Sequence, residues 1–178
     1  FTTAGGMTAN HVARWNGSVW SALGWGMYST VVYLTVYDGE LIAGGSFTAA
    51  GGTAAIFIAR WNGSAWSALG TGMESTVFTL AVHGGELVAG GSFKTAGGIA
   101  VNRIARWSGS SWSALGVGVN GAVFALTVHN GELIVGGNFT SAGGAAASRI
   151  ARWNGSDWSA LGTGMNDAVF ALTVHDGA

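Results

Sequence analysis

Aromatic, cationic and acidic side chains recur at fixed spacing along the chain, and their types could support binding chemistry. Pairs of tryptophans lie five residues apart around a short turn: Trp15 and Trp20, Trp61 and Trp66, Trp107 and Trp112, and Trp153 and Trp158. An arginine precedes each pair and a glutamate recurs between pairs: Arg14, Arg60, Arg106 and Arg152, then Glu40, Glu86 and Glu132. Paired indoles could form a platform for sugar rings, and the arginines could bind a ligand carboxylate.

Both patterns also have a structural explanation, which we favour. Burying an indole removes about 150–250 Å² from water, worth several kcal/mol at about 25 cal/mol per Å², so the pairs are expected to pack within or between repeated units. Each arginine is expected to pair with a glutamate or to lie on an indole face. Trp25 differs, because the equivalent residues are Thr71, Val117 and Thr163, and we expect it to be exposed.

Histidines precede a predicted turn in successive copies, at His83, His129 and His175, with Tyr37 at the same position of another copy. A metal site needs ligands that converge, whereas residues one repeat apart diverge. We therefore interpret the histidines as polar residues flanking a turn, and we expect no metal and no other cofactor.

Four asparagines match the N-x-S/T pattern of glycosylation: Asn16, Asn62, Asn138 and Asn154. Three of them stand in the word "NGS", which a tight turn explains without any sugar. Glycosylation and a purely structural role both remain open for these positions.

Catalysis has little support in this sequence. A catalytic site brings unlike residues together, whereas this chain repeats the same few, and its single-copy polar residues are scattered. We therefore predict that the protein is not an enzyme.

Composition narrows the classes of partner. The 178 residues are 49% hydrophobic but only 8% charged, against about 25% in typical soluble domains, and include 32 glycines with neither proline nor cysteine. A net charge of −1 provides no basic surface for nucleic acid. No apolar run reaches the roughly 20 residues of a membrane span, so membrane insertion is not expected.

The chain compared with itself explains the recurrence. Successive arginines, Arg14, Arg60, Arg106 and Arg152, lie 46 residues apart, and the surrounding fourteen-residue word has eleven positions identical in all four copies. We interpret residues 1–178 as a single repeat domain, divided into a partial blade over 1–30, blades over 31–76, 77–122 and 123–168, and a partial blade over 169–178.

One unit is predicted to contain four strands in two hairpins. In the first, Val123–His129 and Glu132–Phe139 flank Asn130-Gly131, a pair typical of the type I′ turn. In the second, a two-residue turn at Asn154-Gly155 is expected between strands that place Trp153 beside Trp158. Four short antiparallel strands per repeat predict an all-β fold, a β-propeller of four-stranded blades with about four blade equivalents. A β-solenoid is the alternative.

The repeat also resembles the kelch family. The resemblance rests on a glycine doublet (Gly90-Gly91), the aromatic strand with Trp107, then Trp112, Leu115 and a Gly-Met dipeptide such as Gly72-Met73. The near-identical units resemble the propeller repeats of secreted bacterial proteins more closely than eukaryotic kelch adaptors. That similarity implies an extracellular or cell-surface location.

The two ends carry incomplete units, and strand edges left open in this way recruit other chains. We therefore expect association through the termini, with other copies of the chain, in a larger ring or filament, or with a longer continuation of it. The predicted function is an extracellular structural or interaction module. The alternative is a multivalent carbohydrate-binding lectin with one weak site per blade.

Overall fold

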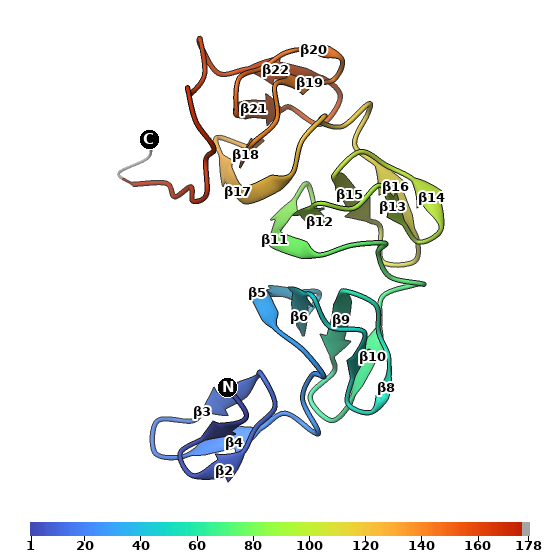
Figure 1. Ribbon diagram of the computed structural model, residues 1–178, viewed down its shortest axis with the longest axis vertical. Helices are drawn as coiled ribbons and strands as arrows, with labels where there is room; N and C mark the ends of the chain where they lie inside the picture. The colour runs from blue at the N-terminus through green and yellow to red at the C-terminus, as the bar shows by residue number, and fades with distance from the viewer. Residues whose placement is uncertain (176–178) are drawn as a thin grey trace.

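The blades of this protein follow one another along an arc, with the first and last described strands at its two ends (Figure 1). The computed structural model describes residues 1–175 and contains strands but no helix in this range. The repeated four-stranded antiparallel sheets define an all-β protein, a β-propeller of about four blade equivalents.

Each complete blade is one antiparallel sheet whose strands follow chain order. The strands of the three blades are β5 (Val31–Tyr37), β6 (Glu40–Gly45), β9 (Ile58–Trp61) and β10 (Trp66–Ala68); β11 (Val77–His83), β12 (Glu86–Gly91), β15 (Ile104–Trp107) and β16 (Trp112–Ala114); and β17 (Val123–His129), β18 (Glu132–Gly137), β21 (Ile150–Trp153) and β22 (Trp158–Ala160). Ahead of them, β3 (Ala13–Trp15) and β4 (Trp20–Ala22) form the outer pair of a partial blade.

A small hairpin lies in the first partial blade and in each complete blade. These hairpins are β1 (Thr3–Ala4) with β2 (Met7–Thr8), β7 (Ala49–Ala50) with β8 (Thr53–Ala54), β13 (Thr95–Ala96) with β14 (Ile99–Ala100), and β19 (Ser141–Ala142) with β20 (Ala145–Ala146). Isolated bridges tie a hairpin to the preceding unit, as between Met73 and Ala96. Strands of two residues are too short to show the alternation of apolar and polar residues by which a strand is recognised in a sequence.

The type I′ turn predicted for the first hairpin is confirmed. Asn130 and Gly131 have φ values of 50° and 79°, and Asp38 and Gly39 have 50° and 74°. These left-handed conformations favour Asn, Asp and Gly. The equivalent turn expected at Asp176-Gly177 lies outside the described residues.

The second turn corrects the prediction of a two-residue loop. Trp153 is the Cα partner of Trp158, so four residues connect the strands. The Oδ1 atom of Asn154 accepts hydrogen bonds from the backbone N–H groups of Ser156 (2.9 Å) and Asp157 (2.8 Å). The side chain therefore closes the turn, which an asparagine can do where a backbone bond alone would not suffice.

The glycine doublet lets neighbouring blades approach each other. A methyl group placed on Gly90 would lie 2.5 Å from Cγ1 of Val123 in the next blade, and one on Gly136 would lie 2.6 Å from Cγ1 of Val169. Since carbon atoms pack at about 3.5–4.0 Å, only glycine leaves room for these valines. The doublet thus sets the spacing of the blades.

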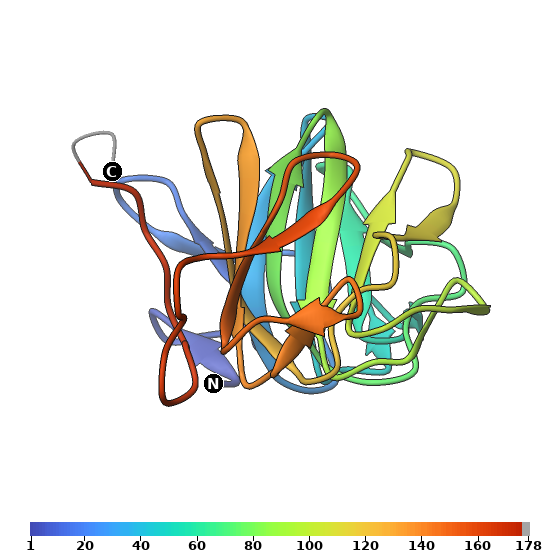
Figure 2. The ribbon, with the colours of Figure 1, turned by 90° about the horizontal axis from the view of Figure 1, so that it is seen from above.

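The innermost strands β5, β11 and β17 run side by side (Figure 2). β17 is buried mainly in its first half, and its second half is partly exposed. The register shifts between Val123 and Ala125, so Phe124 is the extra residue of a β-bulge in this strand. Its ring lies 5.5 Å from that of Phe78 and 4.9 Å from that of Phe170, measured between centroids.

Residues 169–175 belong to no described sheet, although the sequence predicted a strand there. Val169 N–H donates to the carbonyl of Gly137 at 3.1 Å, and the Val169 side chain packs on Gly136. The segment therefore occupies the place of an inner strand. The remainder of the predicted partial blade, residues 176–178, lies outside the described residues.

Replacing Gly90 by Ala tests the close approach of the blades. The added methyl group must displace Val123, and overpacking of this kind lowers the free energy of unfolding by about 1–3 kcal/mol. Urea denaturation of Gly90→Ala, Val123→Ala and the double variant measures the effect. We expect the double variant to be less destabilised than the sum of the single ones, and simple additivity would contradict the contact.

Replacing Gly109 by Val tests conformational strain alone. Gly109 has a φ of 94° and no atom lies within 4 Å of an added methyl group. A β-branched residue is strained at this φ, so we expect a loss of more than about 1 kcal/mol in the free energy of unfolding. An unchanged melting temperature would show that the turn adopts another conformation.

Candidate functional site

The two tryptophans of each unit face each other across a strand pair. Trp107 and Trp112 are Cα partners in β15 and β16, and their ring centroids lie 5.3 Å apart with an interplanar angle of 52°. The other three pairs have nearly the same geometry, with centroids 5.3–5.4 Å apart. Tilted contacts of this kind are favourable between aromatic rings.

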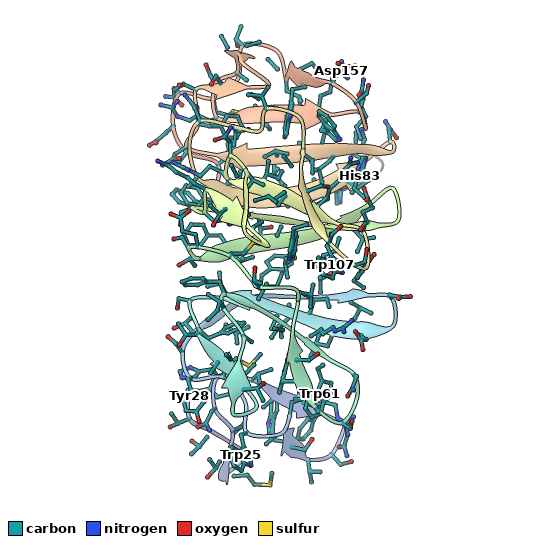
Figure 3. The ribbon with its side chains drawn as sticks, turned by 90° about the vertical axis from the view of Figure 1, so that its right-hand side faces the viewer. Trp25, Tyr28, Trp61, His83, Trp107 and Asp157 are labelled. Carbon is teal, nitrogen blue, oxygen red and sulfur yellow. The ribbon has the colours of Figure 1, made fainter. Side chains whose placement is uncertain are left out.

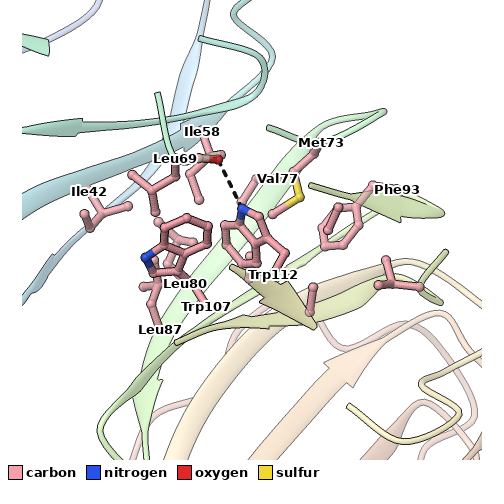
Figure 4. Packing of buried hydrophobic residues seen from close by; sticks show 14 residues of the cluster. Ile42, Ile58, Leu69, Met73, Val77, Leu80, Leu87, Phe93, Trp107 and Trp112 are labelled. Atoms are coloured by element: carbon pink, nitrogen blue, oxygen red, sulfur yellow. Dashed lines mark hydrogen bonds between the residues drawn. The ribbon is translucent and has the colours of Figure 1, made fainter. Parts of the chain in front are cut away.

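The second tryptophan of a pair also reaches back to the preceding unit. Trp112 Nε1–H donates to the carbonyl of Leu69 at 3.1 Å (Figure 4). The same bond joins Trp66 to Leu23 at 2.8 Å. Each bond links residues 43 positions apart, so it connects two successive blades.

The glycine after this leucine lies under the tryptophans of the following unit. A methyl group on Gly70 would lie 3.3 Å from Cζ3 of Trp107, and one on Gly116 would lie 3.2 Å from Cζ3 of Trp153. A larger side chain would separate the leucine carbonyl from the indole that donates to it. The Leu-Gly dipeptide and the tryptophan pair therefore form one inter-blade contact.

The exposure of the tryptophans follows from this contact. Trp66 and Trp112 are each 5% exposed, and a preceding Leu-Gly covers both. Trp15 and Trp20 are 49% and 41% exposed, and no preceding unit lies against them among the described residues. Interior pairs thus offer no open platform to a sugar ring, whereas the pair of the first unit does present its indoles to solvent.

The predicted arginine–glutamate pairs form in each complete blade. The distances from arginine Nη1 to glutamate Oε2 are 3.5 Å for Arg60–Glu40, 3.2 Å for Arg106–Glu86 and 3.1 Å for Arg152–Glu132. All three pairs are partly exposed, so each contributes at most about 1 kcal/mol. Arg14 has no such partner among the described residues.

Two of the recurrent histidines, His83 and His129, lie at described hairpin turns. His83 Nε2 is 2.8 Å from the carbonyl of Gly131 in the next blade, and His129 Nε2 is 2.9 Å from Asn130 Nδ2. His175, the third of them, also has an interaction partner. Within the described part of the chain, no group of three or more His, Asp or Glu residues could hold a metal ion.

The four asparagines of the N-x-S/T pattern, Asn16, Asn62, Asn138 and Asn154, are all exposed. Asn62 Oδ1 accepts from the backbone N–H groups of Ser64 and Ala65 at 2.9 Å each, so this side chain stabilises the turn in which it lies. Asn16 makes the corresponding pair of bonds. Glycosylation at these positions stays a prediction.

Trp25 is 75% exposed, which confirms the expectation from the repeat comparison. It lies beside Tyr28, which is 68% exposed, at the N-terminal end of the arc (Figure 3). The two rings border a cleft of about 340 Å³, also lined by Asn10, His11 and Met27. The sequence comparison singled out Trp25 but missed this grouping, because His11 and Asn10 come from a different loop.

Comparison with protein families supports the propeller architecture. Two segments, residues 38–63 and 130–159, match the model of a family described as "Domain of unknown function (DUF5122) beta-propeller". Each segment extends from the first hairpin turn of a blade towards its tryptophan pair. A search of the curated proteins gave no match.

The described residues contain no helix long and apolar enough to cross a membrane. The inter-blade contact recurs three times among the described residues. The sequence comparison did not identify its acceptors, the leucine carbonyls, because every residue has a backbone carbonyl and the residue type does not show which one accepts.

Replacing Trp112 by Phe tests the indole hydrogen bond. The phenyl ring retains most of the packing but leaves the Leu69 carbonyl without its donor, which lowers the free energy of unfolding by about 1–3 kcal/mol. The matched control is Trp20→Phe, at the equivalent but exposed position. Urea denaturation at low protein concentration should show a clearly smaller loss for the control, and equal losses would contradict the role of the bond.

Proposed function

We propose that this β-propeller is an extracellular structural and interaction module that associates head to tail with other copies of the same chain. The head face consists of the exposed Trp15 and Trp20. The tail loop consists of Leu161 and Gly162, at the end of the last complete blade. In the associated state, the head face of one copy packs on the tail loop of another.

The observation that carries this proposal is the same contact repeated three times within the chain. Trp66, Trp112 and Trp158 each donate to the leucine carbonyl of the preceding unit, at 2.8–3.1 Å. The head face has the same pair of residues with the same ring geometry. It therefore has the shape and the free indole donor that the contact requires.

The tail loop is the complementary half. A methyl group on Gly162 would meet nothing within 4 Å, whereas the equivalent Gly24, Gly70 and Gly116 all lie against a tryptophan of the next unit. Leu161 occupies the position of the three leucines whose carbonyls accept the indole bonds. A second copy supplies the head face that the tail loop matches.

Low charge favours such an association. Seven Lys and Arg and eight Asp and Glu are spread over 178 residues, so little electrostatic repulsion opposes the approach of two copies. The inner edge of β3 is also unpaired, since β3 pairs only with β4 among the described strands. An identical contact repeated in one direction closes a ring if the rotation allows and otherwise extends into a filament.

Three finer expectations stay within this proposal. A kelch-like relationship rests on the sequence pattern, an extracellular location is supported by the four exposed asparagines of the glycosylation pattern, and the module is proposed to be non-catalytic. A lectin with one site per blade has less support, because the interior tryptophan pairs are covered by the preceding blade.

Complementary variants test the association. Trp20→Ser removes the donor of the head face, and Leu161→Asp places a charge in the tail loop. Sedimentation velocity should show concentration-dependent association of the wild-type chain and monomers for each variant alone. Mixing the two variants leaves one intact head face and one intact tail loop, so we expect a 1:1 dimer that grows no further.

The control is Val19→Ser, an exposed residue next to Trp20 in the turn, which should associate like the wild type. Formation of the mixed dimer also shows that both variants are folded. A wild-type chain that stays monomeric at high concentration, or a mixture that forms no dimer, would overturn the proposal.

A further inference from the structure

The first unit departs from the other repeats at two positions that lie next to each other in space. Position 25 is Trp, whereas the equivalents are Thr71, Val117 and Thr163, and position 28 is Tyr, whereas the equivalents are Glu74, Asn120 and Asn166. Both aromatic rings are largely exposed. Neither takes part in the inter-blade contact made by tryptophan pairs, so stacking of the blades does not explain them.

The residue at position 28 has a structural task in other units. Glu74 Oε2 accepts from the backbone N–H of Lys94 at 3.1 Å, and Asn120 Oδ1 accepts from the backbone N–H of Thr140 at 2.8 Å. These bonds cap the small hairpin of the next blade. A phenol lacks the carboxylate or amide oxygen for this cap, so Tyr28 places an aromatic ring in solvent where a stabilising bond is found elsewhere.

Hydrogen bonds hold the main chain that carries both rings in a defined place. Asn10 Nδ2–H donates to the carbonyl of Trp25 at 2.9 Å, and Met27 N–H donates to the carbonyl of Asn10 at 3.0 Å. Tyr28 N–H donates to the carbonyl of Ala49 in the small hairpin of the next blade at 3.2 Å. The main chain that carries the two rings is thus fixed by hydrogen bonds to the loop at Asn10 and to the small hairpin of the next blade.

Gly52 makes room for the indole. A methyl group on Gly52 would lie 3.1 Å from Cε3 of Trp25, whereas one on the equivalent Gly98 or Gly144 would meet nothing within 4 Å. The indole therefore rests against the hairpin of the next blade and keeps most of its surface open. This is the form of a preorganised stacking platform.

The cleft beside the platform combines apolar and polar groups without a carboxylate, a lysine or an arginine. It is lined by Asn10, His11, Trp25, Met27 and Tyr28. The aromatic rings offer flat apolar faces, while the phenol hydroxyl, the imidazole and the amide oxygen of Asn10 offer hydrogen-bonding groups. A ligand that matches this lining is neutral, with one apolar face and a polar edge.

We infer that the Trp25–Tyr28 cleft is a binding site for a neutral saccharide. The C–H groups on one face of a pyranose ring pack on the aromatic platform, and its hydroxyl groups bond to Asn10, His11 and Tyr28. The volume of about 340 Å³ lies at the small end of ligand pockets, about 300–1,000 Å³. The ligand is therefore a mono- or disaccharide unit, bound at one place in the chain rather than once per blade.

Two other ring-bearing ligands match the lining less well. Prolines of an extended peptide pack on aromatic rings but have no N–H, and so cannot donate to the acceptor oxygen of Asn10. A nucleotide carries phosphates, and no lysine or arginine lines the cleft to bind them. Hydroxyl groups both donate and accept, which suits all three polar side chains.

The test follows the indole N–H resonances of the nine tryptophans by ¹H–¹⁵N NMR. Trp25→Thr assigns the Trp25 signal by its loss. Methyl glycosides of glucose, galactose, mannose and N-acetylglucosamine are titrated separately, with adenosine and a proline-rich peptide as alternatives. We expect at least one glycoside to shift the Trp25 signal saturably, with a Kd of about 0.1–10 mM, as for small ligands at shallow sites.

Each matched variant introduces the residue that another unit has at the equivalent position. Binding of the active glycoside, measured by weak-affinity chromatography, should weaken about tenfold or more in Trp25→Thr and in Tyr28→Asn, the scale of one lost stacking contact. Val117→Thr, at the exposed position of another unit that is equivalent to Trp25, should bind like the wild type. The inference is overturned if no glycoside shifts the Trp25 signal, if only adenosine or the peptide does, or if Trp25→Thr binds unchanged.

Discussion

In each complete blade the indole of the second tryptophan donates to a leucine carbonyl of the unit before it, and the stacking of the blades depends on this contact. Trp112 and Leu69 lie 43 residues apart in the chain yet only 3.1 Å apart in space, between indole nitrogen and carbonyl oxygen. A buried carbonyl without a partner is costly, so the bond and the burial of the indole support each other. An insertion between the two residues would misplace the donor, which explains physically why the units keep one length.

Glycine serves this arrangement in two different ways. At Gly90 the absence of a side chain lets the valine of the next blade approach, whereas at Gly109 there is open space and only the backbone conformation excludes other residues. The first kind determines the distance between blades and the second closes a turn within one blade. Both kinds recur in every complete unit, and together they account for much of the high glycine content.

The residues that vary between units show where the structure permits change. Positions of the inter-blade contact are constant, because each side chain there touches the neighbouring blade. The residue equivalent to Trp25 varies freely, since it lies on the surface beside a small hairpin. Aromatic residues at Trp25 and Tyr28 therefore leave the stacking intact while they change the chemistry of one surface cleft. Scaffold and binding surface are separated in this way within a single repeat.

The sequence by itself determined the repeat, the blade architecture and the first hairpin turn of each blade, since these depend on local conformation and on comparison of the chain with itself. Asn130-Gly131 specifies its turn through the φ values that both residues tolerate. Only the tertiary structure decided that the second half of β17 is partly exposed. It also decided which carbonyl Trp112 binds and that Asn10 and His11 lie with Trp25 and Tyr28 around one cleft. Such contacts join backbone atoms and loops that are distant in the chain, and neither residue type nor spacing encodes how closely two blades approach.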